Sequence, residues 1–431
     1  MKSIRLTGKT LAFIREHAED NVQTLALRAS RFPDVEMATA IRQIAARQAA
    51  RVKLPTWWAT EGVYYPNHLP MEQCSSEVTA RYKSSLIPEE LRQGGMLTDL
   101  SGGFGVDFAC MAKGFAGATY VERQEELCVL AVHNLPLLGI SNARVMNMDA
   151  VEYLKGMSRQ TVIFIDPARR DPKGKKKVAI NDCEPNVARL HDLLVEKADR
   201  VIVKLSPMLD IAQAMDVLPC VREVHVVAVG GECKELLLVM EQDAHSADAR
   251  IVCTNLPVAV PEEWPEPFVF TRQEEEEADC PLAERLDAYL YEPDSTLLKA
   301  GAFRMVALRY GLKKLHPNSH LYTSEKLVTD FPGRCFRVID SGGFAKHEVK
   351  YLQGYGSKMN LTVRNFPSTV ADLRKRLKIT DGGDDYLFAT TLSNGGKRWV
   401  LCKKVASSDS PKEGESGKAH THNSQLTTHN S

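Results

Sequence analysis

The feature that most constrains the fold is an alternation of short β-branched runs with helical stretches. Five such runs occupy residues 96–100, 119–121, 144–148, 161–165 and 200–205. Consecutive strands separated by helices form parallel sheets with right-handed crossovers, so this order predicts a doubly wound α/β sheet. The first strand of that sheet begins just after Gly95.

Two further β-branched runs, residues 224–229 and 236–240, follow the alternating segment with only a short link that begins Gly230-Gly231. Glycines in so short a link are typical of a hairpin, because its turn requires positive φ angles. The sequence therefore predicts an antiparallel hairpin that completes a seven-stranded sheet.

Patterns on either side of this segment predict additional domains. Apolar spacing indicates helices before residue 91, and Ser75-Ser76-Glu77 has the hydroxyl and acid of a helix start. Beyond residue 330 we expect strands at 335–339 and 360–364, a basic helix over 368–377 and a hairpin turning at Asn394-Gly395-Gly396. We assign the following boundaries: an N-terminal helical region over 1–94, the sheet domain over 95–242, an acidic linker with a helical or ferredoxin-like connecting region over 243–330, a basic α+β module over 331–405 and a disordered tail over 406–431.

The charge is divided unevenly along the chain although the formal net charge is zero. Residues 243–294 hold 14 Asp and Glu against 3 Lys and Arg, whereas residues 299–404 hold 20 Lys and Arg against 8 Asp and Glu. A basic module of this kind is typical of a face that binds a polyanion, and the alternative is a solvated basic surface.

Composition excludes several classes of protein. With 44% hydrophobic and 26% charged residues, the chain is neither fibrous nor disordered as a whole. Its ten cysteines include no C-x-x-C pair, so we expect reduced thiols and no metal site. We find no apolar run of membrane-spanning length and no signal-peptide core, so we expect a cytoplasmic protein without a membrane partner.

A glycine-rich segment follows the first predicted strand: Asp99-Leu100-Ser101-Gly102-Gly103-Phe104-Gly105-Val106-Asp107. Glycines at this edge of a doubly wound sheet allow the backbone to approach a ligand closely. A dinucleotide fingerprint would have a third glycine three positions after Gly105, where this chain has Phe108, so the motif argues against NAD. Asp99 and Asp107 flank the glycines instead.

Four successive parallel strands each end at an acidic residue: Asp99, Glu122, Asp149 and Asp166. Glu122 comes seventeen positions after Gly105, a spacing that suits hydrogen bonds from both hydroxyls of a ribose. Asp149, followed by Ala150, suits an adenine amino group. Any one of these acids on its own is commonly a helix cap or a solvated loop residue, but four in register indicate a shared site.

These residues resemble those of the class I S-adenosylmethionine-dependent methyltransferases, which have a Rossmann-like seven-stranded sheet with a terminal hairpin. The chain is also similar to a narrower bacterial family of these enzymes with a C-terminal THUMP-like domain. That similarity rests on residues 71–77 with Lys83, Asp166-Pro167-Ala168-Arg169-Arg170, residues 203–207, Glu292-Pro293-Asp294 and Lys299-Ala300-Gly301.

The resemblance implies a cofactor, S-adenosyl-L-methionine, and a role for each part of the site. The segment from Asp99 to Asp107, with Ser101, Gly102, Gly103 and Gly105, would hold the methionine end of the cofactor. Glu122 would hold the ribose, and Asp149 with Ala150 the adenine. Asp166 and Pro167 would line the pocket of the methyl acceptor.

The acceptor motif departs from the pattern of base-amino methyltransferases, which have a second proline and an aromatic residue. This chain has Ala168 and Arg169, so the stacking surface for a flipped base is missing. Arg169 and Arg170 are candidates to stack on a base or to pair with phosphate, and the alternative is a solvated loop. Carbon methylation would need a cysteine nucleophile; Cys183 is the nearest, and a bystander thiol is the simpler interpretation.

Cationic residues follow the acceptor motif. Lys173, Lys175, Lys176 and Lys177 lie in a loop beside the predicted acceptor pocket and would contact phosphate. Lys204 and Ser206, at the tip of the fifth parallel strand, either contact the substrate or cap the next segment.

Three hypotheses follow. The first is a methyltransferase that acts on RNA, a tRNA or rRNA base, with the basic C-terminal module binding that RNA. The second is a small-molecule or protein methyltransferase, and the third is a non-catalytic RNA-binding protein with a relic cofactor site. THUMP domains are associated with RNA-modifying enzymes, which favours the first.

Overall fold

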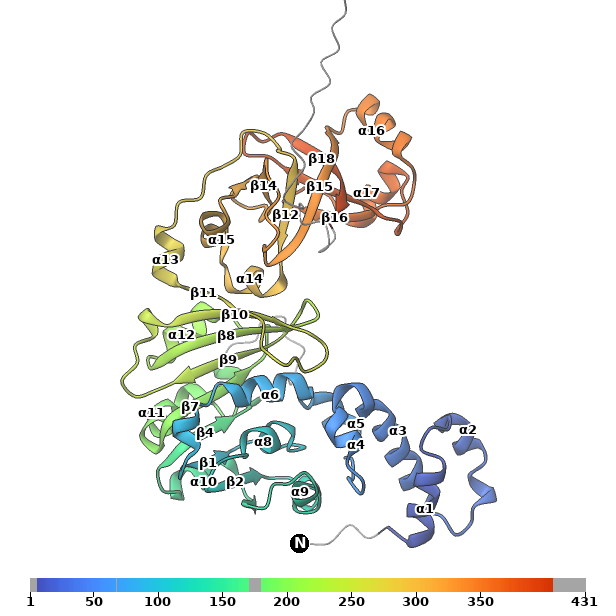
Figure 1. Cartoon of the computed structure of the whole chain (residues 1–431), viewed down its shortest axis with the longest axis vertical. Coiled ribbons are helices and arrows are strands. Elements are labelled where there is room, and N and C mark those ends of the chain that lie inside the picture. Colours follow the sequence, from blue (N-terminus) through green and yellow to red (C-terminus); the bar gives the residue numbers. More distant parts are fainter. Residues whose placement is uncertain (1–5, 67, 170–179, 406–431) are drawn as a thin grey trace, which may run out of the picture. The chain divides into compact units, whose positions relative to one another are not determined.

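The computed structural model describes residues 6–66, 68–169 and 180–405 of the 431-residue chain. The chain divides into two compact units. The first comprises Met1–Cys280 and Pro293–Leu308, and the second comprises Pro281–Glu292 and Arg309–Ser431. Each unit has its own large β-sheet (Figure 1).

The sheet of the first unit has nine strands. Their order across the sheet is β11 (Phe268–Thr271), β10 (Arg250–Leu256), β8 (Val221–Val229), β9 (Glu232–Met240), β7 (Ala198–Leu205), β4 (Gln160–Ile165), β1 (Met96–Asp99), β2 (Gly117–Glu122) and β3 (Ala143–Asn147). Strands β3, β2, β1, β4 and β7 are parallel, as the alternating pattern predicts. Strand β9 is antiparallel to both β7 and β8. The predicted doubly wound sheet with a terminal hairpin is confirmed.

The hairpin between β8 and β9 turns at Gly230 and Gly231, whose φ angles are +58° and +87°. Two consecutive positive φ angles are the requirement of a tight hairpin turn, and glycine meets it without steric cost. This turn brings β9 back between β7 and β8.

Two strands extend the sheet beyond this hairpin. Strand β10 pairs parallel to β8, and β11 pairs antiparallel to β10. Both come from the 243–330 segment, which the sequence led us to expect as a connecting region, so the sheet continues past residue 242. Burial explains the extension, because Ile251, Val252 and Cys253 are buried against neighbouring elements.

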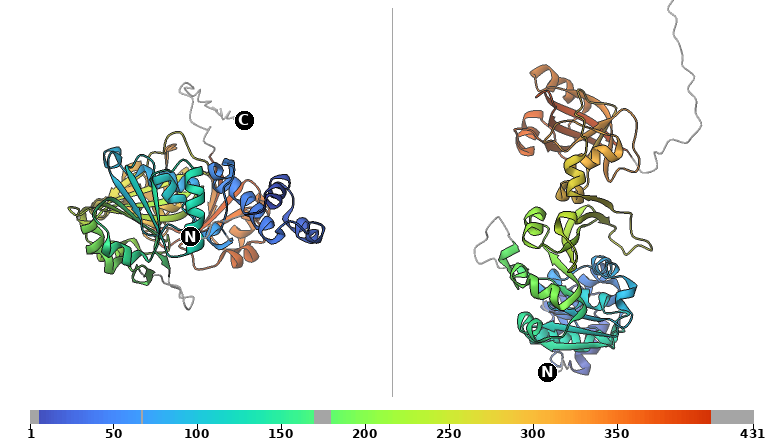
Figure 2. Two further views of the ribbon diagram at one scale, coloured as in Figure 1. Left: turned by 90° about the horizontal axis from the view of Figure 1, so that it is seen from below. Right: turned by 90° about the vertical axis from the view of Figure 1, so that its left-hand side faces the viewer.

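Helices cover both faces of the first sheet (Figure 2). On one face α6, α8 and α9 contribute to a core cluster that also includes strand residues Leu97, Val162 and Ile202. Helices α10, α11 and α12 follow β3, β6 and β7 on the other face. The helices of this α/β layer are α8 (Val106–Met111), α9 (Glu125–Leu137), α10 (Ala150–Gly156), α11 (Val187–Lys197) and α12 (Ile211–Val217).

The N-terminal helices belong to the first unit. They are α1 (Gly8–Glu16), α2 (Val22–Leu27), α3 (Met37–Lys53), α4 (Pro55–Ala59), α5 (His68–Gln73), α6 (Glu77–Ser85) and α7 (Glu89–Arg92). Ser76 caps α6, as its sequence predicts, because the Ser76 hydroxyl accepts a hydrogen bond from the Thr79 amide. The same unit holds α13 (Arg272–Glu277), α14 (Ser295–Ala300) and most of α15 (Phe303–Tyr310).

The second unit is an α+β module built on a seven-stranded sheet. Its strands lie in the order β13 (Lys313–Lys314), β14 (Tyr322–Ser324), β12 (Tyr289–Pro293), β15 (Gly333–Gly342), β18 (Lys397–Lys404), β17 (Asp385–Thr391) and β16 (Asn360–Arg364). The predicted strands at 335–339 and 360–364, the helix α17 (Val370–Leu377) and the hairpin between β17 and β18 are present. Helix α16 (Lys346–Leu352) was not expected from the sequence.

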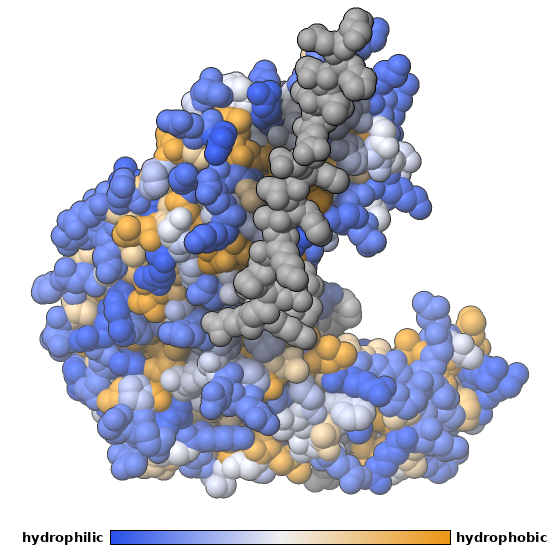
Figure 3. All heavy atoms as spheres, turned by 45° about the horizontal axis from the view of Figure 1, so that its top comes forward, coloured by the Kyte–Doolittle hydropathy of each residue, from blue (hydrophilic) through white to orange (hydrophobic). Residues whose placement is uncertain are grey.

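Hydrophilic side chains cover most of the face shown in Figure 3, and apolar residues are interspersed among them. Across the described ranges, no helix is both long and apolar enough to cross a membrane.

Candidate functional site

The carboxyl ends of β1, β2, β4 and β7 meet at one edge of the first sheet, and two adjoining hollows open there. The Glu122 hollow, of about 400 Å³, is lined by Glu122, Asp149 and Ala150, among others. The Lys204 hollow, of about 640 Å³, is lined by the segment from Ser101 to Asp107 and by Lys204. Ser101 and Asp166 line both hollows, so the two form one continuous cleft.

The glycine segment after β1 is shaped by Tyr120 on the neighbouring strand. A Cβ atom added to Gly102 would lie 2.2 Å from the Tyr120 ring, and the Tyr120 hydroxyl donates a hydrogen bond to the Gly103 carbonyl. Gly105 adopts a φ of +90° at the start of α8. These positions therefore require glycine, as the sequence predicts for a loop that approaches a ligand.

Ser101 joins the ends of β1 and β4. Its hydroxyl donates to Asp99 Oδ1 at 3.2 Å and accepts a hydrogen bond from the Asp166 amide at 2.6 Å. Asp99 is buried, and desolvation raises the pKa of its carboxyl to about 8. The strand ends that carry the predicted acids are thus held together by direct contacts.

Glu122 is buried at the end of β2 and binds backbone rather than a cation. Its Oε2 accepts from the Gly103 amide at 3.0 Å and its Oε1 from the Gln124 amide at 2.9 Å. Asp149 is exposed and caps α10, accepting from the Val151 amide at 2.9 Å. Both carboxylates line the Glu122 hollow.

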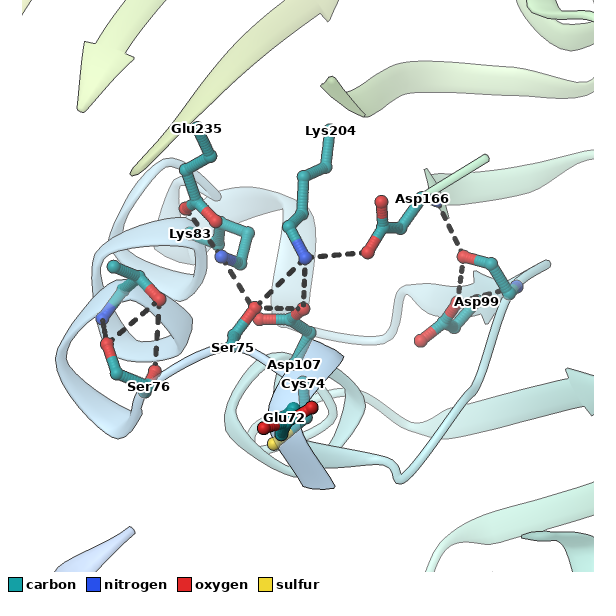
Figure 4. A network of polar contacts seen from close by, with 12 residues as sticks. Glu72, Cys74, Ser75, Ser76, Lys83, Asp99, Asp107, Asp166, Lys204 and Glu235 are labelled. Carbon is teal, nitrogen blue, oxygen red and sulfur yellow. Dashed lines mark hydrogen bonds and ion pairs between the residues drawn. The ribbon is translucent and has the colours of Figure 1, made fainter. Parts of the chain in front are cut away.

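A network of charged side chains lines the Lys204 hollow and continues behind it to Lys83 and Glu235 (Figure 4). Lys204 Nζ donates to Asp166 Oδ2 at 2.6 Å and to Ser75 Oγ at 3.2 Å. Asp107 accepts from Ser75 Oγ at 2.7 Å and lies 3.2 Å from Lys83 Nζ. Lys83 has no exposed surface and donates to Glu235 at 2.6 Å.

Opposing effects set the pKa values of Asp107 and Glu235 in this network. Burial alone would raise the pKa of Asp107, but Lys83 and Lys204 outweigh it and lower the pKa. The pKa of Glu235 is raised, because burial there exceeds the effect of the same two lysines.

The structure places most of the predicted site residues together. Asp99, Ser101, Gly102, Gly103, Gly105, Asp107, Glu122, Asp149, Ala150, Asp166, Pro167, Lys204 and Ser206 line the cleft. Arg169 contributes backbone to the short strand β5 (Ala168–Arg169), which pairs with β6 (Cys183–Glu184). Arg170, Lys173, Lys175, Lys176 and Lys177 lie outside the described residues.

Three members of the charge network were missing from the predicted site: Ser75, Lys83 and Glu235. Ser75 looked like part of a helix start. Lys83 and Glu235 leave little signal in the sequence, because each stands near an exposed charged residue, Arg81 and Lys234 respectively. Cys183 lines both hollows, beside Asp166 and Ala168.

The carboxylate acceptors of the cleft suit a ligand with hydroxyl and amino groups. The cleft offers carboxylate acceptors along the Glu122 hollow and a paired lysine and aspartate at the other end. In the described part of the chain, no group of three or more His, Cys, Asp or Glu side chains has the arrangement of a metal site. The donor set and the combined size are those of an organic ligand site.

Known proteins share this architecture. A family model of a ferredoxin-like domain matches residues 289–332, and a model described as THUMP domain-like matches residues 333–404. The THUMP-like match lies in the second unit, whereas the ferredoxin-like match also includes residues 293–308 of the first unit.

Similar proteins cover most of the chain. A crystal structure of a protein from Porphyromonas gingivalis W83, assigned as a methyltransferase, is 36% identical; the match covers 94% of this chain and 100% of that one, with a TM-score of 0.82. An uncharacterized S-adenosylmethionine-dependent methyltransferase from Mycobacterium tuberculosis strain H37Rv is 21% identical over 314 residues, which is 72% of this chain and 79% of that protein.

Proposed function

This chain belongs to the family of S-adenosylmethionine-dependent methyltransferases that carry a C-terminal THUMP-like domain, and we propose that the substrate it methylates is RNA. The observation that carries this proposal is the pairing of a cofactor-type cleft in the first unit with a basic THUMP-like second unit. The cofactor is S-adenosyl-L-methionine.

The residues of the cleft fit this cofactor. Gly102 leaves no room for a side chain, so backbone from Ser101 to Gly105 can lie against the methionine end. The Glu122 carboxylate is a hydrogen-bond acceptor suited to the ribose hydroxyls, and Asp149 with Ala150 borders the place for adenine. The cofactor supplies a methyl group on a sulfonium, which an unprotonated nucleophile can attack.

Asp166 and Pro167 are the residues that we assign to the acceptor. Asp166 is 38% exposed in its side chain and lines both hollows, so an acceptor in the Lys204 hollow can donate a hydrogen bond to it. Methyl transfer requires the nucleophile to be held in line at near-attack distance, and a fixed carboxylate can supply that orientation. We assign Arg169 and Ser206 to contact with the substrate, and of the two Ser206 lines this hollow.

The charge of the second unit supports RNA as the substrate. Residues 333–404 contain 14 Lys and Arg against 6 Asp and Glu. The exposed side chains Lys346, Lys350, Lys375 and Lys378 have no carboxylate within ion-pair distance among the described residues. Unpaired surface cations of this kind gain most from phosphate contact, because no internal salt bridge has to be broken first.

Aromatic exposure supports the same substrate. Within the described ranges, Tyr351 and Tyr355 are the only aromatic side chains that are exposed, at 60% and 40%. They lie in and just after α16, which also carries Lys346 and Lys350. Aromatic rings among cations are typical of surfaces that stack unpaired bases.

The experiment that tests the substrate is transfer of a labelled methyl group. Total RNA from a strain that lacks this protein would be incubated with the purified chain and methyl-labelled S-adenosylmethionine, beside an Asp166→Ala variant. We expect label in RNA with the wild type and almost none with the variant, whose cofactor affinity stays unchanged in calorimetry. A protein or small-molecule extract that accepts the label, while RNA does not, would overturn the proposal.

A further inference from the structure

Lys204 lies on β7 and lines the Lys204 hollow, but most of its side chain is enclosed by protein. Its side chain is only 13% exposed. The ammonium group donates to Asp166 Oδ2 and to Ser75 Oγ, and lies 3.8 Å from Asp107 Oδ2 (Figure 4). An ammonium has three N–H groups, so these contacts leave little of it for a substrate phosphate.

The carboxylates around Lys204 keep it charged. Burial alone would lower the pKa of its ammonium, but the effect of Asp166, Asp107 and Glu235 is larger and raises it. Lys204 is therefore a cation over the whole physiological pH range.

A second layer of contacts fixes Lys204. Asp107 is held by Ser75 and by Lys83, and Lys83 is held in turn by Glu235. These residues come from the loop before α6, from α6, from α8 and from β9. Lys204 thus cannot change its position without breaking contacts between several elements.

These contacts leave the two carboxylate oxygens of Asp166 in different environments. Its Oδ2 accepts from Lys204, and its backbone amide donates to Ser101. Among the described residues, the hydrogen bonds of Asp166 involve its backbone amide and Oδ2 and leave Oδ1 without one, and the side chain is 38% exposed. One oxygen of the carboxylate is therefore bound by Lys204, and the other is left for a ligand in the hollow.

We propose that Lys204 is a positioning residue, which holds Asp166 by Oδ2 so that Oδ1 accepts the hydrogen of the group to be methylated. This role rests on the proposed contact between Asp166 and the acceptor. It also assigns a task to the N-terminal helical region, because Ser75 and Lys83 keep Lys204 in place. In this arrangement Lys204 does not contact the substrate.

A double-mutant cycle distinguishes positioning from direct substrate binding and from a merely structural role. The variants are Lys204→Met, Asp166→Ala and the double variant, assayed for kcat with methyl-labelled S-adenosylmethionine and RNA from a strain that lacks the protein. We expect Lys204→Met to lower kcat about 10²-fold, because a misplaced carboxylate costs that much. We expect no further loss when Lys204→Met is added to Asp166→Ala.

Other outcomes of the double-mutant cycle would contradict the positioning role. If Lys204 bound RNA or only maintained the fold, its loss would multiply with the loss of Asp166 or would change KM for RNA. Either result, or an unchanged kcat in Lys204→Met, would overturn the proposal. Lys204→Arg, which keeps the charge, should recover part of kcat.

A matched control lies on the same strand. Arg200 is paired with Glu241 at the other end of β7 and is 15% exposed, close to the 13% of Lys204. Arg200→Met therefore removes an equally buried cation without touching the cleft, and we expect kcat within twofold of the wild type.

Hydrogen exchange provides a readout that does not depend on the substrate. In Lys204→Met we expect faster exchange at residues 75–79 and 166–168, with the second unit as internal reference. Unchanged exchange there would overturn the bridging role of Lys204. If RNA takes no label even from the wild type, the proposed substrate fails, and this measurement still tests whether Lys204 holds the Ser75 and Asp166 segments together.

Discussion

The cleft of the first unit and the surface of the second unit both depend on charged side chains, but they hold them in opposite ways. Behind the cleft, Lys83 and Glu235 are 0% and 4% exposed in their side chains and form an ion pair. In the second unit, Lys403 is 51% exposed even where it pairs with Asp385. A buried charge depends on its partner, whereas an exposed charge has water as an alternative partner.

This difference predicts different consequences of mutation. Removing one member of a buried network leaves another charge desolvated and unpaired, so each residue has a large and non-additive effect. Removing one exposed cation removes only one of many weak, salt-dependent contributions to the free energy of polyanion binding. The first arrangement suits precise positioning, and the second suits a flexible polyanion.

The largest effect that we expect is on the stability of Lys83→Met. This change leaves Asp107 and Glu235 buried without their common cation, which should lower the free energy of unfolding by about 3–5 kcal/mol. In the second unit Lys403→Met removes an exposed partner of Asp385 and should cost less than about 1 kcal/mol. Urea unfolding of both variants measures the contrast, and equal losses would contradict it.

The second prediction concerns the pH dependence of stability through Asp99. Burial raises the pKa of this carboxyl to about 8 in the folded chain, against about 4 for an unfolded aspartate. Between these values the folded state binds the extra proton, so the stability that depends on this proton is full below pH 4 and is lost as the pH rises toward 8.

Asp99→Asn removes this ionisation. Its stability relative to the wild type should rise between pH 5 and pH 8, by at most about 1.4 kcal/mol per pH unit. Urea unfolding without cofactor at pH 5, 6.5 and 8 tests the slope. If the free energies of unfolding of the two proteins changed in parallel with pH, Asp99 would be ionised in the folded state. Burial in the cleft would then affect a carboxylate no more than exposure on the second unit does.

The third prediction is a loss of cofactor affinity in Glu122→Ala. Loss of a hydrogen-bonded charged partner costs about 1.5–3 kcal/mol, or about 10- to 150-fold in affinity. The buried carboxylate also orders the Gly103 and Gln124 amides, so the loop loses its support. Glu196→Ala removes an exposed glutamate of α11 and serves as the control. Calorimetric titration with S-adenosylmethionine measures both, and equal affinities would contradict the prediction.

The sequence predicted the elements of the cleft that follow from strand order. Because parallel strands bring their carboxyl ends to one edge, the acids at 99, 122 and 166 had to be neighbours once the alternating pattern was recognised. The turn at Gly230-Gly231 could also be predicted, because it depends only on adjacent residues. The alternating pattern and the glycine turn were therefore enough to predict the parallel strands and the hairpin that the structure contains.

The network behind the cleft could not be predicted in the same way. Lys83 and Glu235 are separated by 151 intervening residues and belong to a helix and a hairpin, so their contact depends on how these elements pack on the sheet. Strand β10 also depends on packing, since its apolar run lies in an acidic segment that composition alone suggested was a linker. Sequence patterns identify faces and edges, and tertiary packing decides which charges meet.

The smallest effect that we expect comes from single cations of the second unit. Lys350→Ala or Lys375→Ala should weaken RNA binding only a few-fold, and each phosphate contact that is lost should lower the slope of log affinity against log salt by about 0.7 for a single strand. Binding measured by fluorescence anisotropy between 50 and 300 mM salt tests this, with Lys9→Ala as a control in the first unit. Complete loss of binding in either variant would mean that the second unit contains a pre-organised site like the cleft. The cleft and the second unit would then bind different ligands but would both depend on pre-organised, mutually dependent charged side chains.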